Sequence, residues 1–157
     1  MIDFSQMLPR LIVALVLGSL MGLERELAGK EAGIRTSMMV AGGSALFSIA
    51  AISLPFLLTQ MTGADVQNIV SSNSGFLAII ANIVVGIGFL GAGIIIKTEE
   101  HVHGLTTAAV IWTVAAVGVL AGIGLIEFAS VGAVIFSIAL YAMRKLGISE
   151  QIQSRRK

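Results

Sequence analysis

The feature that most constrains this chain is a series of five apolar runs separated by short polar segments. A helix that crosses a bilayer needs about 20 predominantly apolar residues, and it pairs all its backbone groups within the segment. A transmembrane barrel would show segments of about ten residues that alternate in polarity, and these runs do not alternate. The sequence therefore predicts an all-α bundle of five transmembrane helices, at about residues 7–28, 36–58, 75–96, 104–122 and 125–144.

The composition supports one membrane domain and excludes several other classes. Only 12% of the residues are charged, about half of the roughly 25% found in soluble domains. We expect a transmembrane domain over residues 1–146 and a short polar tail over 147–157. The net charge of +1 and the lack of a basic, aromatic patch argue against nucleic acid as a partner. With no cysteine, the chain has no disulfide, thiolate nucleophile or cysteine metal site.

The basic residues predict the orientation in the membrane. Almost all of them follow the first, third or fifth run: Arg25, Lys30, Arg35, Lys97, Arg144, Lys145, Arg155, Arg156 and Lys157. The segments after the second and fourth runs contain neither lysine nor arginine. The positive-inside rule then places the N-terminus outside and the C-terminus in the cytoplasm. Arg10 is the exception, and we expect its long side chain to snorkel to the outer interface.

Six charges crowd the segment that follows the first apolar run: Glu24, Arg25, Glu26, Lys30, Glu31 and Arg35. The uncharged residues 11–23 before it span only about 20 Å of helix, short of a hydrocarbon core of about 30 Å. We therefore expect the first helix to continue through the first three charges at membrane depth.

Two interpretations of these charges stand at this point. For Glu24, Glu26 and Arg35, a buried cluster that binds an ion or locks the bundle is as well supported as charges among the lipid headgroups. For Arg25, Lys30 and Glu31, the topology rule favours the headgroup region.

Glycines recur at spacings that suit close helix packing. Gly18 with Gly22 and Gly118 with Gly122 each form a G-x-x-x-G pair. The third run contains four glycines within eight residues, Gly86, Gly88, Gly91 and Gly93. They match G-x-G-x-x-G literally, but no strand precedes them, so the match does not indicate a dinucleotide site. Close packing is favoured over a broken helix that would present backbone groups to an ion.

Few polar residues lie inside the apolar runs. Asn82 is expected to hydrogen-bond another helix, with a place in a pore as the alternative. Thr106 and Thr113, together with Ala109 and Ala116, form a small stripe that predicts a packing seam. We expect Trp112, on the same helix, to lie in the core.

The loop after the third run holds the weak metal-ligand candidates Glu99, Glu100, His101 and His103. A His-x-His pair with nearby carboxylates suits a metal, and carboxylates with retained waters suit Mg²⁺. A charged loop between helices is more often only solvated. No catalytic motif is present, so we expect neither an enzyme nor a bound cofactor.

Several sequence blocks together resemble the MgtC/SapB family of bacterial membrane proteins. They are GLERE at 22–26, AGIRT at 32–36, GSALF at 43–47, GIGFLGAG at 86–93, and GLTTAA at 104–109 followed by Trp112. The resemblance implies a multi-pass protein of the bacterial inner membrane, linked to magnesium limitation, acid stress and survival inside hosts. It also implies a regulator of other membrane complexes, the ATP synthase among them.

This chain departs from the family pattern in places. Many members carry Arg and Gln where this chain has Ala78 and Asn82, and Ser where it has Val85. Many also have a soluble C-terminal domain, which we expect to be absent here.

Two functions follow from these observations. The first is a non-enzymatic regulator that binds a membrane protein complex. The second is an oligomeric transporter or channel for Mg²⁺, another cation or protons, with a homodimer as the simplest assembly. They differ in whether the charges pair in a dry core or line a wet cavity.

Overall fold

The computed structural model describes residues 4–63, 65–72, 75–99 and 101–146, and in these the chain is almost entirely helical. The elements, in chain order, are α1 Phe4–Leu27, α2 Ile34–Thr62, α3 Val66–Ser72, α4 Gly75–Ile94, β1 Ile96–Lys97, β2 Val102–His103, α5 Leu105–Ile123 and α6 Ile126–Lys145.

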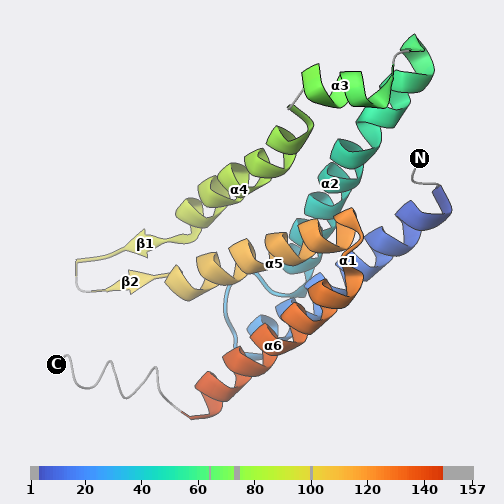
Figure 1. Cartoon of the computed structure of the whole chain (residues 1–157). Helices are drawn as coiled ribbons and strands as arrows, with labels where there is room; N and C mark the ends of the chain where they lie inside the picture. The colour runs from blue at the N-terminus through green and yellow to red at the C-terminus, as the bar shows by residue number, and fades with distance from the viewer. Residues whose placement is uncertain (1–3, 64, 73–74, 100, 147–157) are drawn as a thin grey trace.

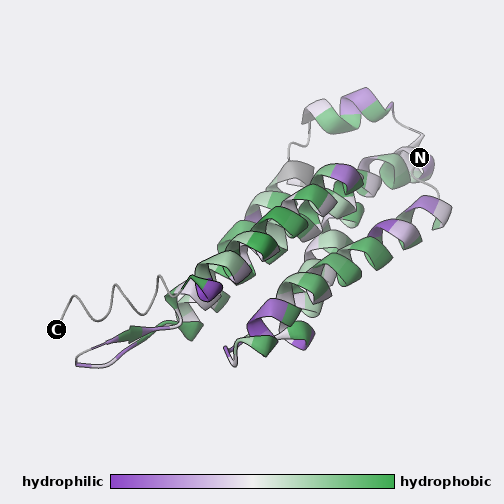
Figure 2. Cartoon of the chain, turned by 90° about the horizontal axis from the view of Figure 1, so that it is seen from below, coloured by the Kyte–Doolittle hydropathy of each residue, from purple (hydrophilic) through white to green (hydrophobic). Residues whose placement is uncertain are grey.

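The predicted all-α membrane fold is confirmed. Within the described residues, α1, α2, α5 and α6 are each long and apolar enough to cross a membrane. α4 contributes a shorter apolar segment, Ala78–Ile94, which at 17 residues is at the lower limit for a crossing helix. Figure 2 shows apolar residues along the helices and hydrophilic ones gathered mainly near their ends, as a bilayer requires.

α2 and α5 form the middle of the bundle, and α5 contacts each of the other long helices. α2 packs against α1 and α5, and also contacts α4, while α6 closes the far side by packing on α1 and α5 (Figure 1). Contacts between helix ends place the C-terminal ends of α1 and α6 beside the N-terminal end of α5. The segments rich in basic residues therefore share one end of the bundle, as the topology prediction requires. Which end faces the cytoplasm stays a prediction.

Two elements were not predicted. The short helix α3 lies in the segment after the second run, which we expected to be a loop. α2 stops before it because Gly63 adopts a left-handed conformation at φ 69°, where its N–H donates to the Thr59 carbonyl. The second element is a two-stranded antiparallel hairpin of β1 and β2 between α4 and α5, with Ile96 opposite His103.

Glycine and alanine form the contact surfaces of α2. A Cβ atom added at Gly18 of α1 would lie 2.7 Å from the Ala41 Cβ, and one at Gly118 of α5 would lie 2.8 Å from the Ala41 Cα. Ala41 thus lies against glycines from two helices, α1 and α5, which also contact each other. Gly22 and Gly122 extend the same close approach, meeting Ile34 and Ala45. The small residues let the backbones approach closely, which drives helix association within lipid.

The packed face of α5 differs from the seam expected along Thr106, Ala109, Thr113 and Ala116. Thr106 and Ala109 are exposed, whereas Thr107, Val110 and Val114 are buried. Trp112, expected in the core, is 51% exposed. The predicted stripe does consist of small residues, but it is not the buried face of α5. The buried face contains Gly118 and Gly122, because these glycines let the α2 backbone approach.

Candidate functional site

The centre of the charged end is Arg25, near the C-terminal end of α1. It is only 5% exposed, and its Nη2 donates a hydrogen bond of 2.7 Å to the Thr107 hydroxyl in the first turn of α5. We expected Arg25 among the headgroups, and the structure corrects this. Arg25 follows Gly22 by three residues and Gly18 by seven, so it lies on the same side of α1 as these glycines. That side faces the rest of the bundle, and there Arg25 reaches α5.

Glu24 connects α1 to α6. Its Oε1 lies 3.7 Å from Nη1 of Arg144, and its Oε2 lies 4.0 Å from Nη1 of Arg25. The Glu24 side chain is 9% exposed, whereas that of Arg144 is 39% exposed. Glu24 Oε2 and Arg25 Nε are buried without a hydrogen-bond partner among the described residues. The carboxylate is therefore held between two guanidinium groups, one inside the bundle and one at its edge.

Thr107 links Arg25 to the loop between α1 and α2. Its hydroxyl accepts from Arg25 and donates to Oε2 of Glu31 at 3.5 Å. Since Arg25 lies beside the positive N-terminal end of α5, a nearby carboxylate is favourable there. We call Glu24, Arg25, Glu31, Thr107 and Arg144 the charged cluster. It ties α1, α5, α6 and the α1–α2 loop together at one end.

Glu26 has a different role. It is exposed, and its Oε2 accepts a 2.9 Å hydrogen bond from the backbone N–H of Ile34, the first residue of α2. Gly33, which precedes α2, offers no side-chain cap. Glu26 therefore caps α2 from the neighbouring helix, where a negative charge also suits the helix dipole.

Replacing Glu26 tests this cap. We expect Glu26→Ala to lower the free energy of unfolding by about 1 kcal/mol, the usual effect of losing a capping side chain. Glu26→Gln keeps an acceptor oxygen and should lose less. Unfolding in mixed detergent micelles, followed by circular dichroism, measures both. Equal losses for the two variants would contradict the capping role.

Sequence reasoning selected these residues only in part. Of Glu24, Glu26 and Arg35, the structure places Glu24 in the charged cluster, gives Glu26 the cap, and leaves Arg35 exposed. The cluster members Thr107 and Arg144 were not selected. Thr107 lies in the GLTTAA block, beside the chosen Thr106, but only the direction in which α5 faces separates the two threonines.

Arg10 lies at the opposite end of the bundle. Its Nη1 donates to the carbonyl of Gly122 at 3.2 Å, near the C-terminal end of α5. A cation is favourable at this negative end of the helix dipole. Arg10 therefore has a partner within the protein, while its snorkelling to the outer interface stays a prediction.

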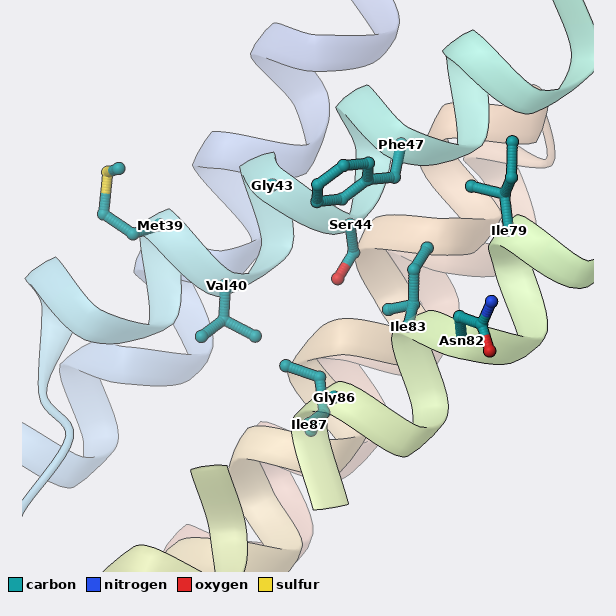
Figure 3. Close-up of a pocket in the computed structure, with 10 residues that line it drawn as sticks. All are labelled: Met39, Val40, Gly43, Ser44, Phe47, Ile79, Asn82, Ile83, Gly86 and Ile87. Atoms are coloured by element: carbon teal, nitrogen blue, oxygen red, sulfur yellow. The ribbon is translucent and has the colours of Figure 1, made fainter. Parts of the chain in front are cut away.

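A groove of about 440 Å³ lies between α2 and α4, away from the charged cluster. Figure 3 shows the side chains that line it: Met39, Val40, Gly43, Ser44, Phe47, Ile79, Asn82, Ile83, Gly86 and Ile87. None of them is charged. Asn82, expected to hydrogen-bond another helix, is exposed and has no hydrogen-bond partner among the described residues. Of the α4 glycines, only Gly91 meets another helix, with Ala108 at 3.5 Å from an added Cβ.

The metal-ligand candidates do not form a cluster in the described part of the chain. Glu99, His101 and His103 are exposed, and the two histidine ring centroids lie 6.1 Å apart. Glu100 lies outside the described residues. No group of three or more His, Asp or Glu suited to a metal occurs among the residues that the structure describes.

The charged cluster is a set of paired polar groups that joins four segments of the chain. It contains two guanidinium groups, two carboxylates and one hydroxyl, and the hydroxyl of Thr107 accepts from Arg25 and donates to Glu31. Breaking a buried ion pair by removing one partner is costly. The cluster can therefore fix the relative positions of four segments.

Comparison with known proteins identifies close relatives. The model of the MgtC family matches residues 11–148. The chain is 44% identical over 130 residues to "Protein MgtC" of Brucella abortus, covering 83% of this chain and 48% of that protein. It is 41% identical over 144 residues to an uncharacterised protein of Synechocystis, covering 92% of this chain and 55% of the relative.

A third relative carries a functional name. It is the "Putative magnesium transporter YhiD" of Escherichia coli, 35% identical over 142 residues, with 90% of this chain and 62% of that protein covered. The chain thus spans about half to three fifths of the length of these relatives. No solved structure matches the chain.

Proposed function

The chain belongs to the MgtC family, and from that premise we propose that it is a non-enzymatic membrane protein that regulates another membrane complex during adaptation to low magnesium or acid. We place it in the bacterial inner membrane. The proposal concerns this transmembrane part, since the relatives are longer than the chain.

The charged cluster is the observation that carries the proposal. Its charges face one another: Arg25 and Arg144 lie at Glu24, and Thr107 joins Arg25 to Glu31. The groove of about 440 Å³ is lined without any of them. A transport path normally presents charged or polar side chains to a water-filled cavity. Charges that pair with one another at the end of the bundle favour a structural lock over a conduit.

A second candidate is a transporter of Mg²⁺, another cation or protons. The printed name of the Escherichia coli relative favours it. So does Glu24 Oε2, which is buried without a hydrogen-bond partner among the described residues, because a carboxylate oxygen with a free lone pair can bind a cation. A transporter would use Glu24 as a ligand and would need it ionised.

Ion flux separates the two candidates. Purified protein in liposomes is given an inward Mg²⁺ gradient and then a proton gradient, each followed with a trapped dye. We expect no flux above empty liposomes, for wild type and for Glu24→Gln alike, because the paired charges do not line a path. Flux that wild type supports and Glu24→Gln abolishes, with the fold intact by circular dichroism, would establish the transporter instead.

Growth tests the regulatory role itself. We expect a strain without this gene to grow slowly at low Mg²⁺, and expression of wild-type protein to restore growth. Arg25→Leu should fail to restore it, because the lock is lost. The exposed Arg35→Leu is the matched control and should restore growth. Equal rescue by Arg25→Leu and Arg35→Leu would show that growth at low Mg²⁺ does not need the charged cluster.

A further inference from the structure

We infer that the α4 face containing Asn82 and Gly86, together with the α2–α4 groove, is the contact surface for a second copy of this chain in the membrane. The inference is independent of whether the protein regulates or transports. It rests on two polar groups and on glycines that the single chain leaves open.

The two polar groups both lie at the groove. Ser44 is 3% exposed and its hydroxyl points from α2 into the space between the helices (Figure 3). Asn82 lies on the opposite wall, about 10 Å along α4 from its start. Neither the Ser44 hydroxyl nor the Asn82 amide has a hydrogen-bond partner among the described residues. In hydrocarbon an unpaired amide is costly, so a membrane-embedded partner is expected to pair with it.

The glycines of α4 also support a helix contact at this face. Gly18, Gly22, Gly118 and Gly122 are all used inside the chain, where an added Cβ would lie within 3 Å of another helix. By contrast, a Cβ at Gly86 or Gly93 would meet nothing within 4 Å. Gly86 follows Asn82 by four residues, so the two share one face of α4. This face has the small residues of a helix contact but no helix against it.

A second copy suits this face better than an unrelated helix. Copies of a membrane protein insert with one orientation, so a two-fold axis along the membrane normal brings Asn82 to the same depth in both. The amide both donates and accepts hydrogen bonds, so it is complementary to itself. Gly86 lets the two α4 backbones approach, and exposed Phe89, one turn further along α4, is the side chain large enough to enter the groove of the neighbouring copy.

Cysteine cross-linking tests the contact directly, because the natural chain contains no cysteine. Val85→Cys lies near the middle of α4, at a residue that is 71% exposed, and Ile135→Cys lies near the middle of α6, at one that is 57% exposed. We expect oxidation in lipid nanodiscs or native membranes to link Val85→Cys into a dimer of the chain. Ile135→Cys, equally lipid-facing, should stay monomeric, since a disulfide needs Cα atoms within about 7 Å.

Two further substitutions show whether the contact uses this face. Gly86→Leu should abolish cross-linking, while Gly132→Leu on α6 should leave it unchanged. Both leave the single chain room to fold, because an added Cβ meets nothing within 4 Å at either glycine. Asn82→Leu should weaken dimer affinity about tenfold, measured by fluorescence transfer on dilution into lipid.

Three outcomes would overturn the inference. Val85→Cys that stays monomeric would leave lipid as the occupant of the groove. Cross-linking only to a different protein would make that protein the occupant. Cross-linking that persists unchanged in Gly86→Leu and Asn82→Leu would show that the copies meet through another surface.

Discussion

Gly118→Leu is expected to lower the free energy of unfolding by about 3 kcal/mol or more, the upper part of the range for overpacked cores. The nearest atoms to an added Cβ are all backbone atoms of Ala41. A side chain can rotate away from a clash, but the α2 backbone at this point is also in close contact with Gly18 of α1. α5 would have to separate from α2, which removes the central contact of the bundle.

Gly88→Leu on α4 is the matched control for this experiment. The substitution is the same, but an added Cβ at Gly88 meets nothing within 4 Å. We expect its stability to equal or exceed that of wild type, because leucine favours the helix over glycine. Unfolding in mixed micelles with rising denaturing detergent measures both variants. Similar losses at Gly118 and Gly88 would show that close approach to α2 does not hold the bundle together.

Arg25→Leu is expected to cost about 3 kcal/mol of stability, the lower part of the range for removing one partner of a buried ion pair. The loss leaves Glu24 with Arg144 alone, at the edge of the bundle, and leaves the Thr107 hydroxyl without its donor. Arg35→Leu changes the same residue type in an exposed position, and we expect it to alter stability by less than about 0.5 kcal/mol.

A double-mutant cycle isolates the hydrogen bond at the centre of the charged cluster. We expect Arg25→Leu and Thr107→Val to couple by about 2 kcal/mol, as befits a buried hydrogen bond to a charged group. Unfolding of the four proteins in the same micelles gives the coupling energy. Simple additivity would mean that the 2.7 Å contact between Arg25 and Thr107 contributes nothing to stability.

The fold was largely predictable because hydrocarbon leaves the backbone few choices. The run at 7–28 became α1 at Phe4–Leu27, and the run at 125–144 became α6 at Ile126–Lys145. The argument from length, that the first helix must continue through the charges at 24–26, also held. By contrast, α3 carries too few apolar residues to give a signal, and the β1–β2 hairpin depends on pairing across a loop.

The candidate site was predictable only as a region of the chain. Charge density located the segment from Glu24 to Arg35, but not which of its side chains turn inward. Arg25 and Thr107 are separated by 82 positions, and no local pattern joins them. The face of each helix that is buried depends on the neighbouring helix, and one residue of helix rotation turns a side chain by about 100°.

What the sequence by itself determined, then, is the number and type of the apolar helices and the positions of the charges between them. Both follow from burial in lipid, which acts on each segment separately. Only the tertiary structure decided that Arg25 lies inside the bundle, that Glu26 caps α2, and that Gly86 and Asn82 stay open while Gly18 and Gly118 close on Ala41. Those outcomes depend on which helices meet, and helix association in lipid is set by shape and polar pairing between segments far apart in the chain.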